Sequence, residues 1–132
     1  MRLAFAIVGT SLAFSACRGR DRDLPAPYRE LTVPEERLES AEAQTRGRAL
    51  FLLHCALCHG DRADGRGVRR QGLSSPPRDF TDPAWPKATS PRRVYFTIRE
   101  GSRGTAMPAW KVLDEGQTWD LTAYLLSAGQ PR

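Results

Sequence analysis

The chain has 132 residues and a formal net charge of +5, from 20 Lys and Arg against 15 Asp and Glu. This length suits one small domain, which cannot bury a large apolar core of its own. Three cysteines and two histidines in total leave few ligands for a structural zinc site, which needs four.

The first sixteen residues have the pattern of an export signal. Arg2 gives the segment a positively charged beginning. Residues 3–16 form an apolar stretch that is shorter than the roughly 20 residues a membrane-spanning helix needs. We therefore predict a signal peptide over residues 1–16 and a mature protein outside the cytoplasm.

Cys17 follows two small residues, Ser15 and Ala16, directly after this apolar stretch. The arrangement resembles the lipoprotein box of bacteria, in which the cysteine becomes the lipidated first residue of the mature protein. Phe14 stands where that box usually has Leu, so ordinary cleavage near Ser15 or Ala16 is the alternative. Lipidation of Cys17 would account for an otherwise unpaired cysteine in an exported protein, and several acyl chains would give a stable membrane anchor.

Residues 17–44 are predicted to form this anchored cysteine and a flexible tether. The segment after Cys17 contains three prolines and many charges, with little apolar periodicity before the first clear helix. The alternative is a packed extension, in which Tyr28, Leu31 and Val33 lie on the domain that follows.

The first clear helix is predicted over residues 41–54, with Ser40 as its N-cap. One face of this helix consists of Ala43, Gly47, Leu50, Phe51 and His54. Glycine in mid-helix costs about 1 kcal/mol relative to alanine, so we expect Gly47 to let another helix backbone approach closely.

The residues that follow this helix form the pattern Cys-x-x-Cys-His, with Cys55, Cys58 and His59. This is the pattern of covalent c-type haem attachment. Each thiol adds to one vinyl group of the haem, and the histidine ligates the iron through a ring nitrogen. We therefore predict one haem c, bound covalently through Cys55 and Cys58, with His59 as an iron ligand.

Two other interpretations of the cysteine pair are weaker. A zinc site would need two more ligands, and one local loop rarely surrounds a tetrahedral ion with two cysteines, His54 and His59. A thioredoxin-like redox pair belongs to a βαβ setting, and no such pattern surrounds these cysteines.

The region between His59 and the next helix has no clear periodicity and is predicted to form loops. Its Gly-rich run from Asp61 to Gly67 is followed by no Lys-Ser or Lys-Thr pair, so it is not a phosphate-binding loop of the Walker type. Glycine is expected there because the backbone must turn near the edge of the haem.

A further helix is predicted to begin at Pro91, with Ser90 as its N-cap. Its apolar stripe consists of Val94, Tyr95 and Ile98. Gly101 is expected to end it in a left-handed conformation. The helix leads the chain into the loop that contains Met107.

Met107 is the predicted second iron ligand. A low-spin electron-transfer haem needs such a ligand, usually Met or His. The chain contains two methionines, and Met1 belongs to the export signal. His54 directly precedes a haem-bound cysteine and is expected to stay on the side of His59. Pro108 restricts the backbone of Met107, and a thioether ligand raises the reduction potential.

The last helix is predicted over residues 115–127, with Asp114 as its N-cap. Leu121 and Tyr124 lie three positions apart and face the same way. The apolar surface continues over Trp119 and Leu125.

These motifs, in this order and at these spacings, resemble the class I monohaem cytochrome c family over roughly residues 43–128. The matching segments are Gly47–Phe51, Cys55–Gly60, Gly101–Trp110 and Leu121–Leu125. The resemblance implies an all-α cytochrome c fold, with three to five short helices around one covalently bound haem, here in residues 45–132. In this family, a glycine and aromatic pair on the first helix crosses a similar pair on the last.

The sequence departs from the family after the haem motif. Many members have a proline there whose carbonyl accepts the imidazole N–H, whereas the first proline here is Pro76. Pro76 or Pro77 is therefore a candidate to orient His59. The haem propionates are negatively charged, so Arg78 or Trp85 is a candidate to bind them.

Charge is unevenly distributed along the chain. Residues 45–132 carry 14 Lys and Arg against 8 Asp and Glu, whereas residues 18–44 carry 5 against 7. A basic domain favours redox partners with acidic docking surfaces and fast, salt-sensitive association. It does not indicate nucleic-acid binding, because an exported haem protein meets none.

We therefore predict a monomeric, membrane-tethered one-electron carrier, not an enzyme, on the periplasmic side of a bacterial membrane. The first alternative is a fixed haem subunit of a larger respiratory or dehydrogenase complex, which an ordered tether would favour. The second is a ligand-binding or catalytic haem domain in which Met107 dissociates. The predicted loop around Met107 offers no residue suited to acid or base catalysis, which argues against the second alternative.

Overall fold

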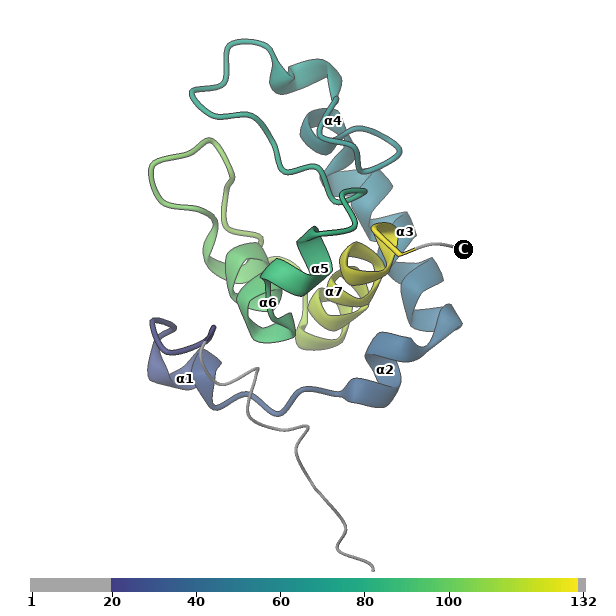
Figure 1. Cartoon of the computed structure of the whole chain (residues 1–132), viewed down its shortest axis with the longest axis vertical. Helices are drawn as coiled ribbons and strands as arrows, with labels where there is room; N and C mark the ends of the chain where they lie inside the picture. Colours follow the sequence, from purple (N-terminus) through teal and green to yellow (C-terminus); the bar gives the residue numbers. More distant parts are fainter. Residues whose placement is uncertain (1–19, 131–132) are drawn as a thin grey trace, which may run out of the picture.

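The computed structural model describes residues 20–130, and these residues form helices and loops without a strand (Figure 1). Two long helices, α3 (Ala41–His54) and α7 (Glu115–Ala128), pack against each other, and α6 (Pro91–Glu100) packs against α7. The all-α class predicted from the sequence is confirmed. The predicted signal peptide and Cys17 lie outside the described residues.

Capping side chains begin the three long helices where the sequence predicted them. Ser40, Ser90 and Asp114 each accept a hydrogen bond from the backbone N–H three residues further on. Gln117 completes the cap of α7, because its side chain accepts in return from the backbone N–H of Asp114. These bonds satisfy N–H groups that have no partner within the helix, and so they fix where each helix starts.

Three short elements connect α3 to α6: α4 (Ala56–His59), the 3-10 turn η1 (Val68–Arg70) and α5 (Trp85–Ala88). Each has about one turn, so its formation depends on tertiary packing rather than on helix propensity. The rest of this region runs as loops, as predicted. None of the helices in the described part of the chain is long and apolar enough to cross a membrane.

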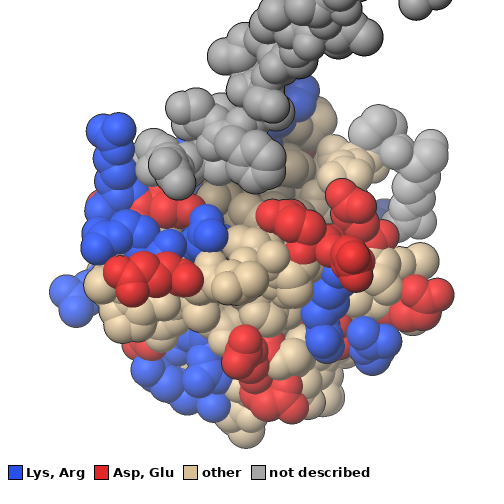
Figure 2. All heavy atoms as spheres, turned by 90° about the horizontal axis from the view of Figure 1, so that it is seen from below, with Lys and Arg blue, Asp and Glu red and all other residues tan. Residues whose placement is uncertain are grey.

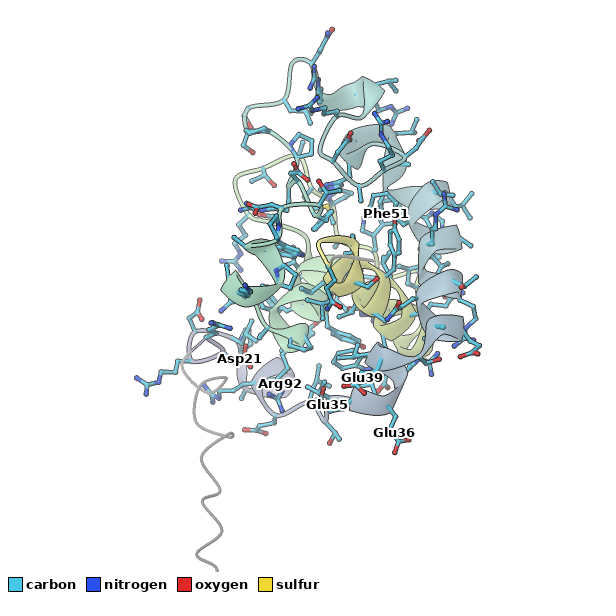
Figure 3. All side chains as sticks on the ribbon, turned by 45° about the vertical axis from the view of Figure 1, so that its right-hand side comes forward. Asp21, Glu35, Glu36, Glu39, Phe51 and Arg92 are labelled. Atoms are coloured by element: carbon cyan, nitrogen blue, oxygen red, sulfur yellow. The ribbon has the colours of Figure 1, made fainter. Side chains whose placement is uncertain are left out.

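Helices α3 and α7 approach closely at Gly47. A Cβ atom at this position would lie 2.0 Å from the carbonyl oxygen of Asp120, so only glycine fits against the α7 backbone. One turn later, Phe51 is fully buried, and its ring centroid lies 5.2 Å from that of Tyr124 (Figure 3). The glycine and aromatic crossing that the family resemblance implied is therefore present.

Residues 20–44 pack on the rest of the molecule, so the expected flexible tether is replaced over this range by the packed extension that was its alternative. We call these residues the N-terminal extension. It contains α1 (Ala26–Arg29) and α2 (Glu35–Glu39), and α1 lies against α6 while α2 lies against α7 (Figure 1). Leu24 is only 2% exposed. The sequence did not predict this packed conformation, because it depends on contacts with α6 and α7 that lie far along the chain.

Asp21 fastens the beginning of the N-terminal extension. Its side chain is buried and accepts hydrogen bonds from the hydroxyl of Ser90, which caps α6, and from Arg92 (Figure 3). Arg92 also donates to the carbonyl of Leu31 at 2.8 Å. Burial of this carboxylate is energetically acceptable because both of its oxygens have hydrogen-bond partners.

A second buried carboxylate, Asp120, joins three helices. It accepts from Arg37 of α2 and from Arg46 of α3, each at 2.7 Å. Burial of Asp120 opposes its charge, but the hydrogen bonds from Arg46 and Arg37 outweigh burial and lower its pKa from the usual value. The N-terminal extension is thus held at both ends by paired charges.

Gly101 ends α6, but not in the predicted left-handed conformation. Its φ is 74° and its ψ is −172°, so only the sign of φ agrees with the prediction. A Cβ atom here would lie 2.7 Å from the carbonyl oxygen of Met107 and 2.9 Å from the carbonyl carbon of Pro108. Glycine is needed here because the chain turns back against the loop that it enters, which leaves no space for a side chain.

Candidate functional site

A cavity of about 570 Å³ opens between the loop that precedes α5 and the loop that follows α6. Four predicted site residues line it, three from the haem-attachment motif and one from a distant loop: Cys55, Cys58, His59 and Met107. The volume lies within the usual range of cofactor sites, about 300–1,000 Å³. The structure therefore brings the predicted site residues to one place.

Cys55 and Cys58 lie at the two ends of one helical turn, and no disulfide joins them. The backbone N–H of Cys58 donates to the carbonyl of Cys55 at 3.1 Å. Burial, and then the charge of Cys58, raise the pKa of Cys55 to about 12. Among the described residues, no three His, Cys, Asp or Glu side chains gather as a metal site.

A backbone carbonyl orients the ring of His59. Its Nδ1 lies 3.1 Å from the carbonyl oxygen of Arg78, and the tautomer that donates this bond leaves Nε2 free to bind a metal. Burial lowers the pKa of His59, although the Arg78 carbonyl opposes this shift, so the neutral form is favoured. The expectation that Pro76 or Pro77 supplies this carbonyl is wrong by one residue.

Aromatic rings enclose the same imidazole. The ring centroid of Phe80 lies 4.9 Å from that of His59, and the centroid of Phe51 lies 6.3 Å from it. The backbone N–H of Phe80 donates to the carbonyl of Ala63 at 2.8 Å. The loop after α4 therefore holds both the carbonyl and the ring that position His59.

Met107 lies in the loop of residues 101–110, which we call the Met107 loop. Its carbonyl accepts from the backbone N–H of Ser102 at 3.1 Å, and its own N–H donates to the hydroxyl of Thr105 at 3.2 Å. Met107 and His59 also line a second, small cavity of about 20 Å³ that adjoins the core. The loop is thus closed on itself and presents Met107 to the same space as His59.

His54 also lines the large cavity, and its ring centroid lies 5.1 Å from that of Trp110, the last residue of the Met107 loop. Two histidines therefore border the site. This makes His54 the natural control when Met107 is tested as a ligand.

Two buried polar atoms at the cavity have no hydrogen-bond partner in the described part of the chain: Nε1 of Trp85 and the hydroxyl of Thr89. Such groups are costly to bury alone. Arg78 lies over the Trp85 ring, with its guanidinium carbon 5.6 Å from the ring centroid. A donor N–H and a guanidinium at one wall fit an anionic group such as a haem propionate, so the site fits the predicted cofactor.

Sequence reasoning had identified Trp85 and Arg78 as candidate propionate partners, and the structure places them together. It missed Thr89 and the carbonyl of Arg78. A lone threonine before a helix carries no pattern, and a carbonyl is present at every residue, so neither gave a signal that the sequence could supply.

Comparison with known proteins gives a consistent result. Residues 42–125 match the family model described as cytochrome c oxidase, cbb3-type, subunit III. The chain is also similar to the cbb3-type cytochrome c oxidase subunit CcoP of Azospirillum brasilense, with 30% identity over 95 residues. That match covers 71% of this chain and 31% of the CcoP subunit, so the chain corresponds to about a third of that relative.

Solved structures, two of them cytochromes, share the fold. The KustC0563 c-type cytochrome is 30% identical, with a TM-score of 0.52, and the match covers 64% of this chain and 98% of that one. Cytochrome CL of Methylophaga aminisulfidivorans MPT is 24% identical, with a TM-score of 0.52 over 67% of this chain and 56% of that one. A chain of the Kuenenia stuttgartiensis reducing HAO-like protein complex is 24% identical, with a TM-score of 0.57 over 75% of this chain and 45% of its own length. The predicted cytochrome c fold is confirmed.

Proposed function

The chain belongs to the family of cbb3-type cytochrome c oxidase subunit III, and we propose that it is an exported, membrane-tethered carrier of single electrons rather than an enzyme. Residues 42–125 form a c-type cytochrome domain, which carries one covalently bound haem c. The haem supplies an iron that takes up and releases one electron. The observation that carries the proposal is the meeting of Cys55, Cys58, His59 and Met107 around one cavity.

Each of these residues has a separate role in the proposal. Cys55 and Cys58 hold the haem through thioether bonds at one edge of the ring. His59 ligates the iron through Nε2, while its Nδ1–H donates to the carbonyl of Arg78. Met107 provides the second ligand, and its thioether favours the reduced iron.

The surroundings suit electron transfer better than substrate chemistry. The backbone hydrogen bonds of the Met107 loop and the rings around His59 hold both ligands in place. When both ligands keep their positions in the two oxidation states, the reorganisation energy of electron transfer is small. The Met107 loop contains no acidic, histidine or cysteine side chain that could serve as an acid or base.

We place the protein on the periplasmic side of a bacterial membrane. The proposal rests on the export signal of residues 1–16 and on Cys17 as the lipidated residue. Its relationship to CcoP, a subunit of a cytochrome c oxidase, supports a membrane-associated site of action. Only residues 18 and 19 separate Cys17 from the N-terminal extension, so the anchor would hold the packed domain close to the bilayer.

A second candidate is a fixed haem subunit of a larger respiratory complex. The packed N-terminal extension favours it, because a domain that swings between partners needs a longer free tether. CcoP is named as an oxidase subunit, and the Kuenenia relative as part of a complex. Co-purification in a stable, stoichiometric complex from native membranes would favour this candidate over a free monomeric carrier.

The partner surface that we propose surrounds the haem-attachment turn. Leu57 and Val68 are 49% and 82% exposed there, and the backbone N–H of Gly67 donates to the carbonyl of Cys58. Residues 60–78 contain five arginines and two aspartates, and all five arginines are exposed. An apolar centre with a basic rim fits a redox protein with an acidic docking surface.

The decisive experiment is the absorption spectrum of the full-length protein, expressed with a haem-maturation system. We expect a c-type spectrum that survives acid–acetone extraction and, in the oxidised state, the long-wavelength sulfur-to-iron band of methionine ligation. Met107→Ala should lose this band and lower the reduction potential, because a thioether stabilises the reduced iron. His54→Gln is the matched control, and it should keep both.

Loss of the band in His54→Gln but not in Met107→Ala would show that Met107 is not the ligand. Carbon monoxide binding by the reduced wild-type protein at neutral pH would favour the ligand-binding alternative, in which Met107 dissociates. Recovery of Cys17 in a membrane-bound, acylated peptide would support the lipid anchor, and a soluble mature chain starting near Ala16 would contradict it.

A further inference from the structure

The two ends of the Met107 loop are joined by one ion pair. Glu100 is the last residue of α6, and Lys111 directly follows the loop. The Lys111 ammonium donates to both carboxylate oxygens of Glu100, at 2.7 and 2.8 Å. Beside this pair, the backbone N–H of Trp110 donates to the carbonyl of Ile98 at 2.9 Å. The Met107 loop is therefore closed at its base by this ion pair and this backbone bond.

The N-terminal extension reaches the same carboxylate. The hydroxyl of Tyr28, in α1, donates to Glu100. The ring of Tyr28 packs edge-on against Phe96 of α6, with 4.9 Å between the ring centroids. Burial, followed by the bond to Glu100, raises the pKa of Tyr28 to about 12, so the hydroxyl remains a donor near neutral pH. The pKa of Glu100 is lowered by its hydrogen bonds from Lys111 and Tyr28, so it remains a carboxylate.

The attachment of α1 does not depend on this hydroxyl. Asp21 holds the beginning of the N-terminal extension to Ser90 and Arg92, as Figure 3 shows for Asp21 and Arg92. The Tyr28 ring keeps its contact with Phe96 when the hydroxyl is removed. The hydrogen bond to Glu100 can therefore be deleted without releasing the extension.

We propose that Tyr28 is a positioning residue for Met107, acting through the Glu100–Lys111 pair at the base of the Met107 loop. The inference rests on the proposed function, because it needs Met107 to be an iron ligand. The N-terminal extension is then part of the electron-transfer site, although none of its residues lines the cavity. Any partner that displaces α1 would weaken the hold on the methionine.

Competition with imidazole tests this inference on the full-length, haem-loaded protein. Added imidazole must displace Met107 from the oxidised iron, so its apparent affinity measures how firmly the sulfur is held. Tyr28→Phe should bind imidazole about tenfold more tightly than wild type, since a lost hydrogen bond to a charged group corresponds to a factor of this size. Glu100→Gln should show at least the same gain, because it weakens the bonds from both Tyr28 and Lys111.

Asp23→Asn is the matched control. It removes the ion pair between Asp23, in the same extension, and Arg93 of α6, which keeps its hydrogen bond to the carbonyl of Arg20. Its imidazole affinity should equal that of wild type. Lys111→Arg, which keeps the positive charge, should bind imidazole with nearly the wild-type affinity. Lys111→Met, which removes the ion pair, should bind imidazole more tightly. A general loss of stability would affect the control as well and would not be restored by a conservative change.

Wild-type imidazole affinity in both Tyr28→Phe and Glu100→Gln, with the sulfur-to-iron band intact, would overturn the inference and leave the proposed function standing. Equal gains in Asp23→Asn and Tyr28→Phe would also overturn it, because the effect would then be one of stability. Absence of the band from the wild-type protein would instead overturn the assignment of Met107, and this inference with it.

Discussion

At the scale of single residues, the indole of Trp85 is the clearest sign of what the cavity holds. Its N–H is buried without a partner in the described chain, on a wall that it shares with Arg78. A buried donor of this kind costs about 1–3 kcal/mol when it is left unpaired. The cost disappears when an anionic group of the cofactor accepts the bond.

We predict that Trp85→Phe destabilises the haem-loaded protein by about 2 kcal/mol, because a hydrogen bond to a charged group is lost. Guanidinium unfolding of the holoprotein measures this change in the free energy of unfolding. Trp110→Phe is the control, since it shortens another indole that lines the cavity. A neutral or stabilising Trp85→Phe would show that the indole does not bind the haem propionates.

The site residues differ in how far the sequence could predict them. Cys55, Cys58 and His59 carry a motif, and Met107 follows from a short process of elimination. The carbonyl of Arg78 carries no such mark, because every residue has one and only the folded loop decides which carbonyl faces His59. Side-chain chemistry is therefore visible in the sequence, whereas a backbone partner is not.

At the scale of elements, the crossing of α3 and α7 depends on Gly47. A Cβ atom there would lie 2.0 Å from the carbonyl oxygen of Asp120 and 2.9 Å from Cβ of Tyr124, and neither neighbour is a flexible side-chain end. The helices can approach this closely because glycine has no side chain. The closeness brings Phe51, one turn on, against the ring of Tyr124.

Gly47→Ala should destabilise the holoprotein by about 1–3 kcal/mol through overpacking, despite the better helix propensity of alanine. Gly116→Ala is the control, because the nearest atom to its Cβ is the terminal Nη2 of Arg37, at 3.1 Å, and not the Nε that pairs with Asp120. The control should be neutral or stabilise by up to about 1 kcal/mol. Thermal unfolding of both variants checks this, and equal stability of the two would contradict a tight crossing.

The long helices were predictable because caps and periodicity agree within each of them. Ser40, Ser90 and Asp114 all act as the sequence indicated. The packing of the N-terminal extension could not be predicted in this way, because its prolines and charges resemble those of a free linker. Asp21 becomes ordered by contacts with residues about 70 positions away, and no local pattern records such contacts.

At the scale of the whole molecule, charge is divided between two ends. The N-terminal extension carries four arginines and seven acidic residues, whereas residues 60–78 carry five arginines and two aspartates. Figure 1 shows α1 and α2 at one end and the loops after α4 at the other. Figure 2 shows the α1 and α2 end, where red and blue side chains are interspersed. The basic segment of residues 60–78, which we call the basic surface, therefore lies beside the haem-attachment turn, at the end of the molecule away from the N-terminal extension.

This division predicts that local charge, rather than net charge, controls electron exchange with anionic partners. In the double variant Arg69→Glu and Arg70→Glu, oxidation of the reduced protein by ferricyanide should slow about tenfold at low salt, because steering of an anion to the haem edge is lost. The rate of the wild-type protein should fall with added salt, and that of the variant should change much less. Stopped-flow spectroscopy measures both.

The other end of the molecule provides the control for that experiment. The double variant Arg22→Glu and Arg29→Glu changes the net charge by the same amount at two exposed positions of the N-terminal extension. Its ferricyanide rate should fall much less than that of the first double variant, since the change lies at the opposite end of the molecule. At physiological ionic strength, where the Debye length is about 8 Å, it should stay within about twofold of wild type. Equal slowing in the two double variants would mean that net charge alone acts. No slowing in either would place electron exchange away from the haem-attachment turn, and the proposed docking surface would be wrong.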